Sequence, residues 1–171
     1  MSIKKAVLML AVFSLAIAGP LFSKAKKSAS ASNATGKVQI LNDSDEYAWA
    51  EFEAYESKNG QPAKGLFHYW LEDGSEEIYV DVVYVKVDGE YVWFAGKCTK
   101  ASGELVGRWF FLAAHDGGDP GRLLDHVWWE WLPDTADAET VAERKVNNLE
   151  KPANNKSIET GNVVVNFYDE D

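Results

Sequence analysis

Short runs of aromatic and β-branched residues, separated by turn sequences, follow one another along most of the chain from Lys37 onwards. Runs of this length and alternation are typical of β-strands rather than of helices. Dipeptides such as Asn59-Gly60 and Asp73-Gly74 separate the runs, and their residues tolerate a positive φ in tight turns. The pattern predicts strands over eight ranges: 37–41, 47–56, 64–72, 76–87, 90–99, 104–114, 123–132 and 161–169.

The segment 76–99 predicts a β-hairpin, because Asp88-Gly89 is a preferred two-residue type I′ turn. If these two residues form the loop, Val85 lies opposite Val92 and Val83 lies opposite Phe94. Both faces of the hairpin are then apolar, so we expect the second face to be covered, to surround a cavity or to contact a partner. The first face would carry Val83, Val85, Val92, Phe94 and Cys98, and the second Val80, Val82, Tyr84, Trp93 and Ala95.

The region 133–160 interrupts the strand pattern. Within it, Asp137–Glu150 contains helix-forming residues with acidic side chains at the start, which predicts a short helix or a long irregular excursion. Strands in largely consecutive hairpins predict an all-β domain, a small antiparallel up-and-down barrel of about eight strands, with a two-sheet β-sandwich as the alternative. A barrel of about eight strands is filled by its own side chains or holds one small ligand.

The N-terminus has the pattern of a signal peptide. Lys4 and Lys5 precede an apolar segment, residues 6–19, which is too short for a comfortable membrane span. Two small-x-small sequences, at 16–18 and 29–31, are alternative cleavage sites. We expect residues 1–31 to be a signal peptide and flexible lead-in, and residues 37–171 to form a single β domain. The mature protein would then be secreted or periplasmic and have no membrane span.

The charge of the chain limits its partners. The whole sequence carries a formal net charge of −10, from 17 basic and 27 acidic residues. Residues 1–31 contain five lysines and no acidic residue, so the remainder has 12 basic residues and a net charge of −15. Such a charge argues against a nucleic-acid backbone or an anionic membrane as the main partner. With Cys98 as its one cysteine, the chain can form no intrachain disulfide and no cysteine-based zinc site.

Three aspartates, Asp116, Asp119 and Asp125, cluster in and after a glycine-rich loop. Carboxylates are hard oxygen ligands, and glycines let a backbone fold around an ion, so the cluster suggests a Ca²⁺ site. The spacing lacks the acidic series of an EF-hand. The alternative is a wide turn in which Asp116 caps its own backbone.

All seven tryptophans lie in the strand region. Alternation along the strand places Trp129 and Trp131 on one face and Trp128 on the other. Together with Trp93 and Tyr84 of the hairpin's second face, they are candidates for a surface that stacks on a sugar ring or an apolar ligand. In the alternative interpretation Trp129 and Trp131 belong to the core, and Trp128 packs beneath the excursion that follows this strand.

Two histidines offer an enzymatic interpretation. His115 and His126 lie on either side of the aspartate loop, and they would come together if the strands that this loop joins pair with each other. With Asp116 they could form an acid–base or metal site, as in a small extracytoplasmic hydrolase or isomerase. The sequence contains no HExxH arrangement and no Gly-x-Ser-x-Gly elbow.

The stretch Lys64–Trp131 places its turn glycines and strands in a distinctive order. An aromatic-rich strand and a β-branched strand are followed by Val106-Gly107 and by the loop Asp116-Gly117-Gly118-Asp119-Pro120-Gly121. In this order it resembles a group of uncharacterised secreted bacterial β-domain proteins. The resemblance implies a secreted β domain and carries no known activity. Tyr84 stands where those proteins often have a cysteine, so no role of that thiol transfers to this chain.

These features predict an exported, acidic, non-enzymatic β-barrel that binds a small molecule or a glycan, a cation at residues 116–125, or another extracytoplasmic protein. The hydrolase or isomerase described above is one alternative, and a structural envelope protein is the other. The sequence predicts neither the identity of the ligand nor the oligomeric state.

Overall fold

The computed structural model describes residues 31–42, 44–118 and 124–168. Within these residues it contains nine strands, one α-helix and one short 3₁₀ turn. The strands are β1 (Asn33–Leu41), β2 (Tyr47–Tyr55), β3 (Lys64–Leu71), β4 (Glu77–Asp88), β5 (Tyr91–Lys100), β6 (Trp109–His115), β7 (His126–Trp131), β8 (Asn155–Lys156) and β9 (Ile158–Asn166). The helix is α1 (Ala138–Asn147), and the 3₁₀ turn is Gly103–Leu105.

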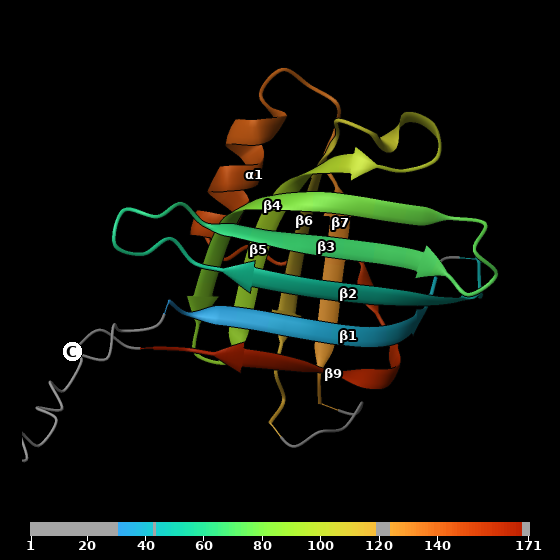
Figure 1. Cartoon of the computed structure of the whole chain (residues 1–171), viewed down its shortest axis with the longest axis horizontal. Coiled ribbons are helices and arrows are strands. Elements are labelled where there is room, and N and C mark those ends of the chain that lie inside the picture. Colours follow the sequence, from blue (N-terminus) through green and yellow to red (C-terminus); the bar gives the residue numbers. More distant parts are fainter. Residues whose placement is uncertain (1–30, 43, 119–123, 169–171) are drawn as a thin grey trace, which may run out of the picture.

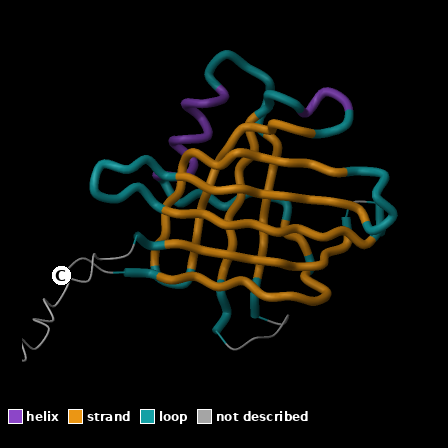
Figure 2. The backbone as a smooth tube through the Cα atoms, in the orientation of Figure 1, coloured by secondary structure: helices purple, strands orange, loops and turns teal. Residues whose placement is uncertain are grey.

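All nine strands belong to one antiparallel sheet, in the order β8-β7-β6-β5-β4-β3-β2-β1-β9. Strands β1 to β8 are neighbours in the sheet in the same order as in the chain, which confirms the predicted up-and-down arrangement. The sheet curls into a barrel, so that β9, β1, β2 and β3 cross in front of β5, β6 and β7 at a steep angle (Figure 1). Figure 2 shows that strand segments make up nearly all of this curled wall and that the loops lie at its ends.

The segment that contains β8 and β9 brings the barrel close to closure. Strand β8 pairs with β7 at one edge of the sheet, and after Ser157 the chain continues as β9, which pairs with β1 at the other edge. One segment therefore connects both edges of the sheet. The sheet is thus nearly closed, and the exposed hydrogen-bonding groups that remain belong to the side of β9 that faces away from β1.

Two aspartates join the remaining part of the seam. The carboxylate of Asp125 accepts hydrogen bonds from the backbone N–H of Val163 in β9 (2.7 Å) and from that of Gly117 in the β6–β7 loop (2.9 Å). Asp116 accepts one from the N–H of Val165 in β9 (2.9 Å). The free edge of β9 thus donates to carboxylates in place of a neighbouring strand, and hydrogen bonds to an ionised acceptor are the stronger kind.

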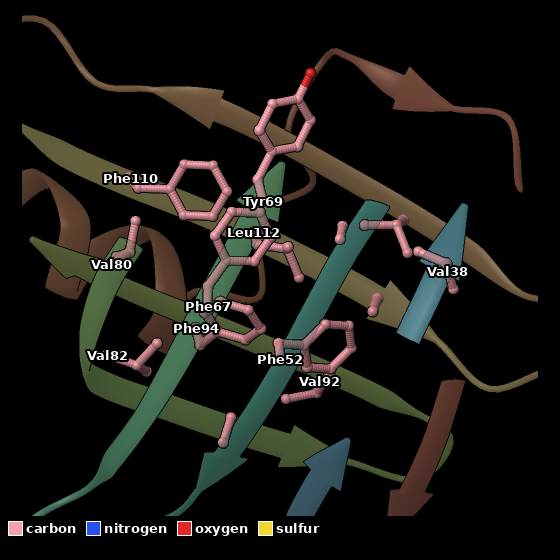
Figure 3. Packing of buried hydrophobic residues seen from close by; sticks show 14 of the residues in the cluster. Val38, Phe52, Phe67, Tyr69, Val80, Val82, Val92, Phe94, Phe110 and Leu112 are labelled. Atoms are coloured by element: carbon pink, nitrogen blue, oxygen red, sulfur yellow. The ribbon is translucent and has the colours of Figure 1, made fainter. Parts of the chain in front are cut away.

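The barrel interior is a packed aromatic and aliphatic core. The ring of Phe67 lies 4.5 Å from that of Phe110, and the ring of Phe94 lies 5.3 Å from that of Phe52, measured between centroids. Figure 3 shows these side chains converging from strands on opposite sides of the barrel. Gly36 makes room for this packing, because a side chain there would overlap the ring of Phe52 on the paired strand.

The outer face of β4, β5 and β6 is covered by α1, as Figure 1 shows at the upper left. Ala138, Ala142 and Val146 of the helix are buried against Trp93 and Phe111 of the sheet. This second apolar cluster covers Tyr84, Trp93 and Ala95 of the predicted second face of the hairpin. In the described part of the chain, no helix is both long and apolar enough to cross a membrane.

The hairpin of β4 and β5 exists, but its predicted register is wrong. Asp88 pairs with Tyr91, so Gly89 and Glu90 form the two-residue loop in place of Asp88-Gly89. Gly89 has a φ of 57° at the first loop position, where a type II′ turn requires a positive φ. The prediction of a glycine in the turn is confirmed. The turn is of type II′ and not of type I′, and this difference shifts the pairing of the two strands from the predicted register.

A β-bulge between Val82 and Tyr84 also changes which hairpin residues face the core. Val83 was predicted to share a face with Val85 and Phe94 and is instead 43% exposed, whereas Val80 and Val82, predicted for the other face, are buried in the inner core. The extra residue of a bulge reverses the alternation on one side of it. Beyond the bulge, Val85 packs against the inner core and Tyr84 against the cluster beneath the helix, so these two lie on opposite faces, as predicted.

Replacing the seam carboxylate tests how much it contributes to stability. Asp125→Ala leaves two backbone N–H groups without their charged acceptor, and because Asp125 is 2% exposed, water does not readily replace it. We expect the free energy of unfolding, measured by urea denaturation, to fall by about 3 kcal/mol. Asp81→Ala, an exposed aspartate in β4, is the matched control and should change stability by less than about 0.5 kcal/mol. Equal losses in the two variants would contradict a special role of Asp125 in closure.

Candidate functional site

A cavity of about 190 Å³ opens at one end of the barrel. It lies where β1 and β3 end and β4 and β6 begin, and aromatic side chains supply much of its wall. The lining residues are Phe67, Tyr69, Ile78, Phe110, Trp129 and Trp131 from the strands, Leu105 from the 3₁₀ turn, and the polar residues Asn42, Glu76, Asn154 and Lys156.

The aromatic wall is held rigid by ring-to-ring packing. The indole of Trp129 meets the rings of Phe67 and Tyr69 edge-on, at 5.7 Å and 6.0 Å. Trp131 lies 5.1 Å from Phe110. Tilted and edge-to-face contacts of this kind are the favourable arrangements for aromatic pairs, so each ring is fixed by its neighbours. In Figure 3 the hydroxyl of Tyr69 points away from the core side chains.

Of the five aromatic residues proposed from the sequence for ligand binding, only Trp129 and Trp131 line this cavity. Trp93, Tyr84 and Trp128 belong to the cluster outside the barrel, beneath α1. The structure therefore divides the predicted set between the two sides of the sheet. The strand alternation that separates Trp128 from its neighbours is confirmed, and so is its packing against the segment after β7.

Tyr84 has a structural environment at the edge of the helix. Its ring stacks on Trp109 at 5.8 Å, and its hydroxyl donates a hydrogen bond to Glu139 of α1 (3.3 Å). Burial raises the pKa of the Tyr84 phenol, and the nearby carboxylates of Glu139 and Glu143 raise it further. The phenol thus remains protonated at neutral pH and fastens α1 to the sheet.

The two histidines of the enzymatic interpretation do come together. His115 and His126 are direct partners in the pairing of β6 with β7, with ring centroids 6.1 Å apart. They belong to a row of stacked rings that also contains Tyr91, 4.3 Å from His115, and Trp128, 5.3 Å from His126. Nδ1 of His115 lies 3.2 Å from the carbonyl oxygen of Leu124.

Asp116 turns its carboxylate toward the backbone. Besides the N–H of Val165 it accepts the N–H of Gly118 (2.9 Å), which is the self-capping turn given above as the alternative to a cation site. Asp119 lies outside the described residues. Within the described ranges, no three histidine, cysteine, aspartate or glutamate side chains are close enough together to hold a metal ion.

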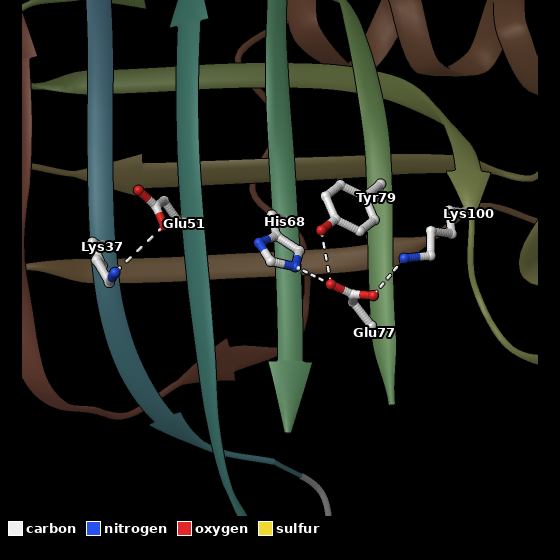
Figure 4. Close-up of polar contacts among 6 residues, drawn as sticks. All are labelled: Lys37, Glu51, His68, Glu77, Tyr79 and Lys100. Atoms are coloured by element: carbon white, nitrogen blue, oxygen red, sulfur yellow. Dashed lines mark hydrogen bonds and ion pairs between the residues drawn. The ribbon is translucent and has the colours of Figure 1, made fainter. Parts of the chain in front are cut away.

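A polar cluster on the outer face of the barrel was not predicted from the sequence. Glu77 of β4 receives hydrogen bonds from Lys100 (2.5 Å) and Tyr79 (2.7 Å), and Nε2 of His68 lies 3.2 Å from it (Figure 4). The ring of His68 is also stacked between Tyr79 and Trp70, at 4.2 Å and 4.4 Å. These residues lie on three strands, so only the cross-strand register brings them together.

In comparisons with known protein families, with curated proteins and with solved structures, no match to this chain was found.

The outer cluster makes stability depend on pH. The hydrogen bond from Lys100, followed by that from Tyr79, lowers the pKa of Glu77 to about 2, from 4.5. A carboxyl whose pKa is lowered on folding stabilises the folded state above its unfolded pKa, and this contribution is lost as pH falls from 4.5 toward 2. Glu77→Gln should therefore be less stable than the wild type at neutral pH and approach it in acid, as measured by urea denaturation across this range.

Because Glu77 is exposed to solvent, added salt should narrow the difference. Glu51→Gln is the matched control, since it removes a longer ion pair (3.6 Å) with Lys37 on the neighbouring strand. A difference between Glu77→Gln and the wild type that does not change with pH would contradict this assignment.

Proposed function

We propose that this protein is an exported, non-enzymatic binding module whose barrel cavity holds one small apolar ring. The single observation that carries the proposal is the aromatic-walled cavity at the end of an otherwise packed barrel. Concave, mostly apolar sites with a few polar groups at fixed positions are the usual form of small-ligand sites. The leader-like pattern of residues 1–31 supports export.

The size of the cavity limits its ligand. A cavity of about 150 Å³ lined by apolar side chains accepts benzene. At about 190 Å³, this one has room for a single ring with a short substituent. A glycan chain or a lipid acyl chain of ordinary length would not fit within this volume.

The polar residues at the cavity would orient such a ligand. Asn42, Glu76 and Asn154 lie in loops and at strand ends around the cavity, whereas the tryptophans come from the middle and end of β7. A bound ring would contact the indoles, and its substituent would point toward the amides and charged groups. Because the aromatic rings are already fixed by one another, little side-chain entropy would be lost on binding.

Indole N–H signals in a ¹H–¹⁵N correlation spectrum test the proposal with phenol as the probe. We expect the signals of Trp129 and Trp131 to shift on addition of phenol, with a Kd of about 0.1–1 mM, as befits so few ligand atoms. Trp131→Ala removes one wall of the cavity and should weaken binding about tenfold. Trp49→Ala is the matched control, because Trp49 is also half-buried but lies on the outer face, stacked on Trp70.

Shifts spread evenly over all seven tryptophans, or an equal effect of the Trp131→Ala and Trp49→Ala substitutions, would contradict binding in the cavity.

A further inference from the structure

A second open space lies on the outer face of the barrel, away from the strands that α1 covers. It is a groove of about 530 Å³ that crosses the four neighbouring strands β9, β1, β2 and β3. Two adjacent rows of outward side chains line it, each with one residue from every one of these strands. The first row is Asn162, Lys37, Glu51 and His68, and the second is Val164, Thr35, Glu53 and Leu66.

The first row presents hydrogen-bond donors and acceptors that the protein itself holds only weakly. Nζ of Lys37 lies 3.6 Å from the carboxylate of Glu51, which is longer than a hydrogen bond, and both side chains are more than half exposed. Figure 4 shows these two side chains and that of His68 side by side on β1, β2 and β3. With Glu53 of the second row, the lining contains one lysine and two glutamates, so its charges largely offset each other.

Asn162 carries an acceptor that lacks a donor. Its side-chain oxygen Oδ1 is enclosed and has no hydrogen-bond partner among the described residues. Such an atom is uncommon in a folded protein, because an enclosed polar group without a partner costs free energy. Rotation of the amide would turn Oδ1 toward the groove that Asn162 lines, where a hydroxyl group from outside the chain could donate to it.

Apolar surface lies directly beside these polar groups. Leu66 and Val164, at the two ends of the second row, are each 38% exposed. Beyond the first row lie the indoles of Trp49 and Trp70, which are half-buried and have Nζ of Lys37 at 5.7 Å and 5.5 Å from their ring centroids. The partner of this face therefore needs apolar and hydrogen-bonding surface at close intervals.

We propose that this groove binds a neutral oligosaccharide of β-linked pyranose units. The hydroxyl groups around the rim of each sugar ring both donate and accept, which suits Asn162, Lys37 and Glu51. The C–H groups on the two faces of the ring are apolar, which suits Leu66, Val164 and the neighbouring indoles. The strong net negative charge of the chain disfavours an acidic glycan.

This site is distinct from the barrel cavity, since the two share no lining residue. The cavity is too small for a glycan chain, whereas a groove on the outer face lets a chain continue beyond both of its ends. The inference therefore goes beyond the proposed function and does not depend on it.

Hexasaccharides of equal length separate the sugar from its charge. The neutral probes are cellohexaose and N-acetylated chitohexaose, and the charged probes are hexagalacturonate and fully deacetylated chitohexaose. We expect a neutral probe to bind with a Kd of about 0.1–1 mM and to shift the indole N–H signals of Trp49 and Trp70, but not those of Trp129 and Trp131. Hexagalacturonate should bind at least about tenfold more weakly. Phenol should leave the affinity for the neutral probe unchanged.

Substitutions in the first row locate the binding site. Asn162→Ala removes the amide that has no partner for Oδ1, so it should weaken binding of the neutral probe about fivefold and leave the midpoint of urea denaturation unchanged. Lys37→Met keeps the length of the side chain and should weaken binding to a similar extent. Lys64→Met is the matched control, because Lys64 is an exposed lysine of β3 outside the groove, and it should have no effect.

Three results would overturn the inference. The first is that neither neutral hexasaccharide shifts the signals of Trp49 and Trp70. The second is that Asn162→Ala and Lys37→Met bind as tightly as Lys64→Met does. The third is that a charged hexasaccharide binds more tightly than both neutral ones at high salt, where long-range attraction is screened. None of these results bears on the cavity, because phenol binding is read from Trp129 and Trp131.

Discussion

Closure of the sheet is the constraint on which the rest of this structure depends. The bent segment β8–β9 supplies hydrogen bonds to both edges of the sheet, and Asp125 and Asp116 accept the N–H groups of Val163 and Val165 in β9 along the seam. Without these contacts the sheet would have two exposed edges and could flatten. With these contacts the sheet curls and encloses an interior. Core side chains fill most of this interior, and the cavity lies at the end of the barrel where they do not fill it.

A curled sheet with apolar residues on both faces needs two separate coverings. The inner face is covered by the sheet itself, through rings such as Phe67, Phe94 and Phe110. The outer face of β4, β5 and β6 is covered by α1, whose small residues Ala138 and Ala142 allow close approach. The many aromatic residues of the sequence are therefore divided between the inner and the outer face of the sheet. Between these two apolar clusters, the inner one adjoins the cavity at the end of the barrel, whereas the outer one is covered by the helix.

The side chains that line the cavity do not share the strongly negative charge of the molecule, because Lys156 and Glu76 offset each other. The chain is strongly acidic overall, yet Lys156 and Arg108 lie against the tryptophan wall. Charges on the surface are screened by solvent over about 10 Å, whereas a group enclosed in the barrel acts on its neighbours with little screening. The net charge of −10 therefore governs solubility and long-range encounters, whereas the interior of the barrel is set by its local side chains.

Local sequence patterns determined most of the fold, because strands, turns and alternation involve residues close together in the chain. They predicted the antiparallel barrel, the short helix and the opposite facing of Trp128 and Trp129. The predicted hairpin register was wrong because the turn is of another type and because Val83 forms a β-bulge. The hydrophobic pattern specifies neither feature. The roles of the polar residues were decided by the tertiary structure alone. Asp125 accepts a hydrogen bond from Val163, which is 38 positions away in the chain. Lys156 lines the cavity because β8 pairs with β7. A side chain's chemistry is written in the sequence, but its partners depend on which distant strands closure brings together.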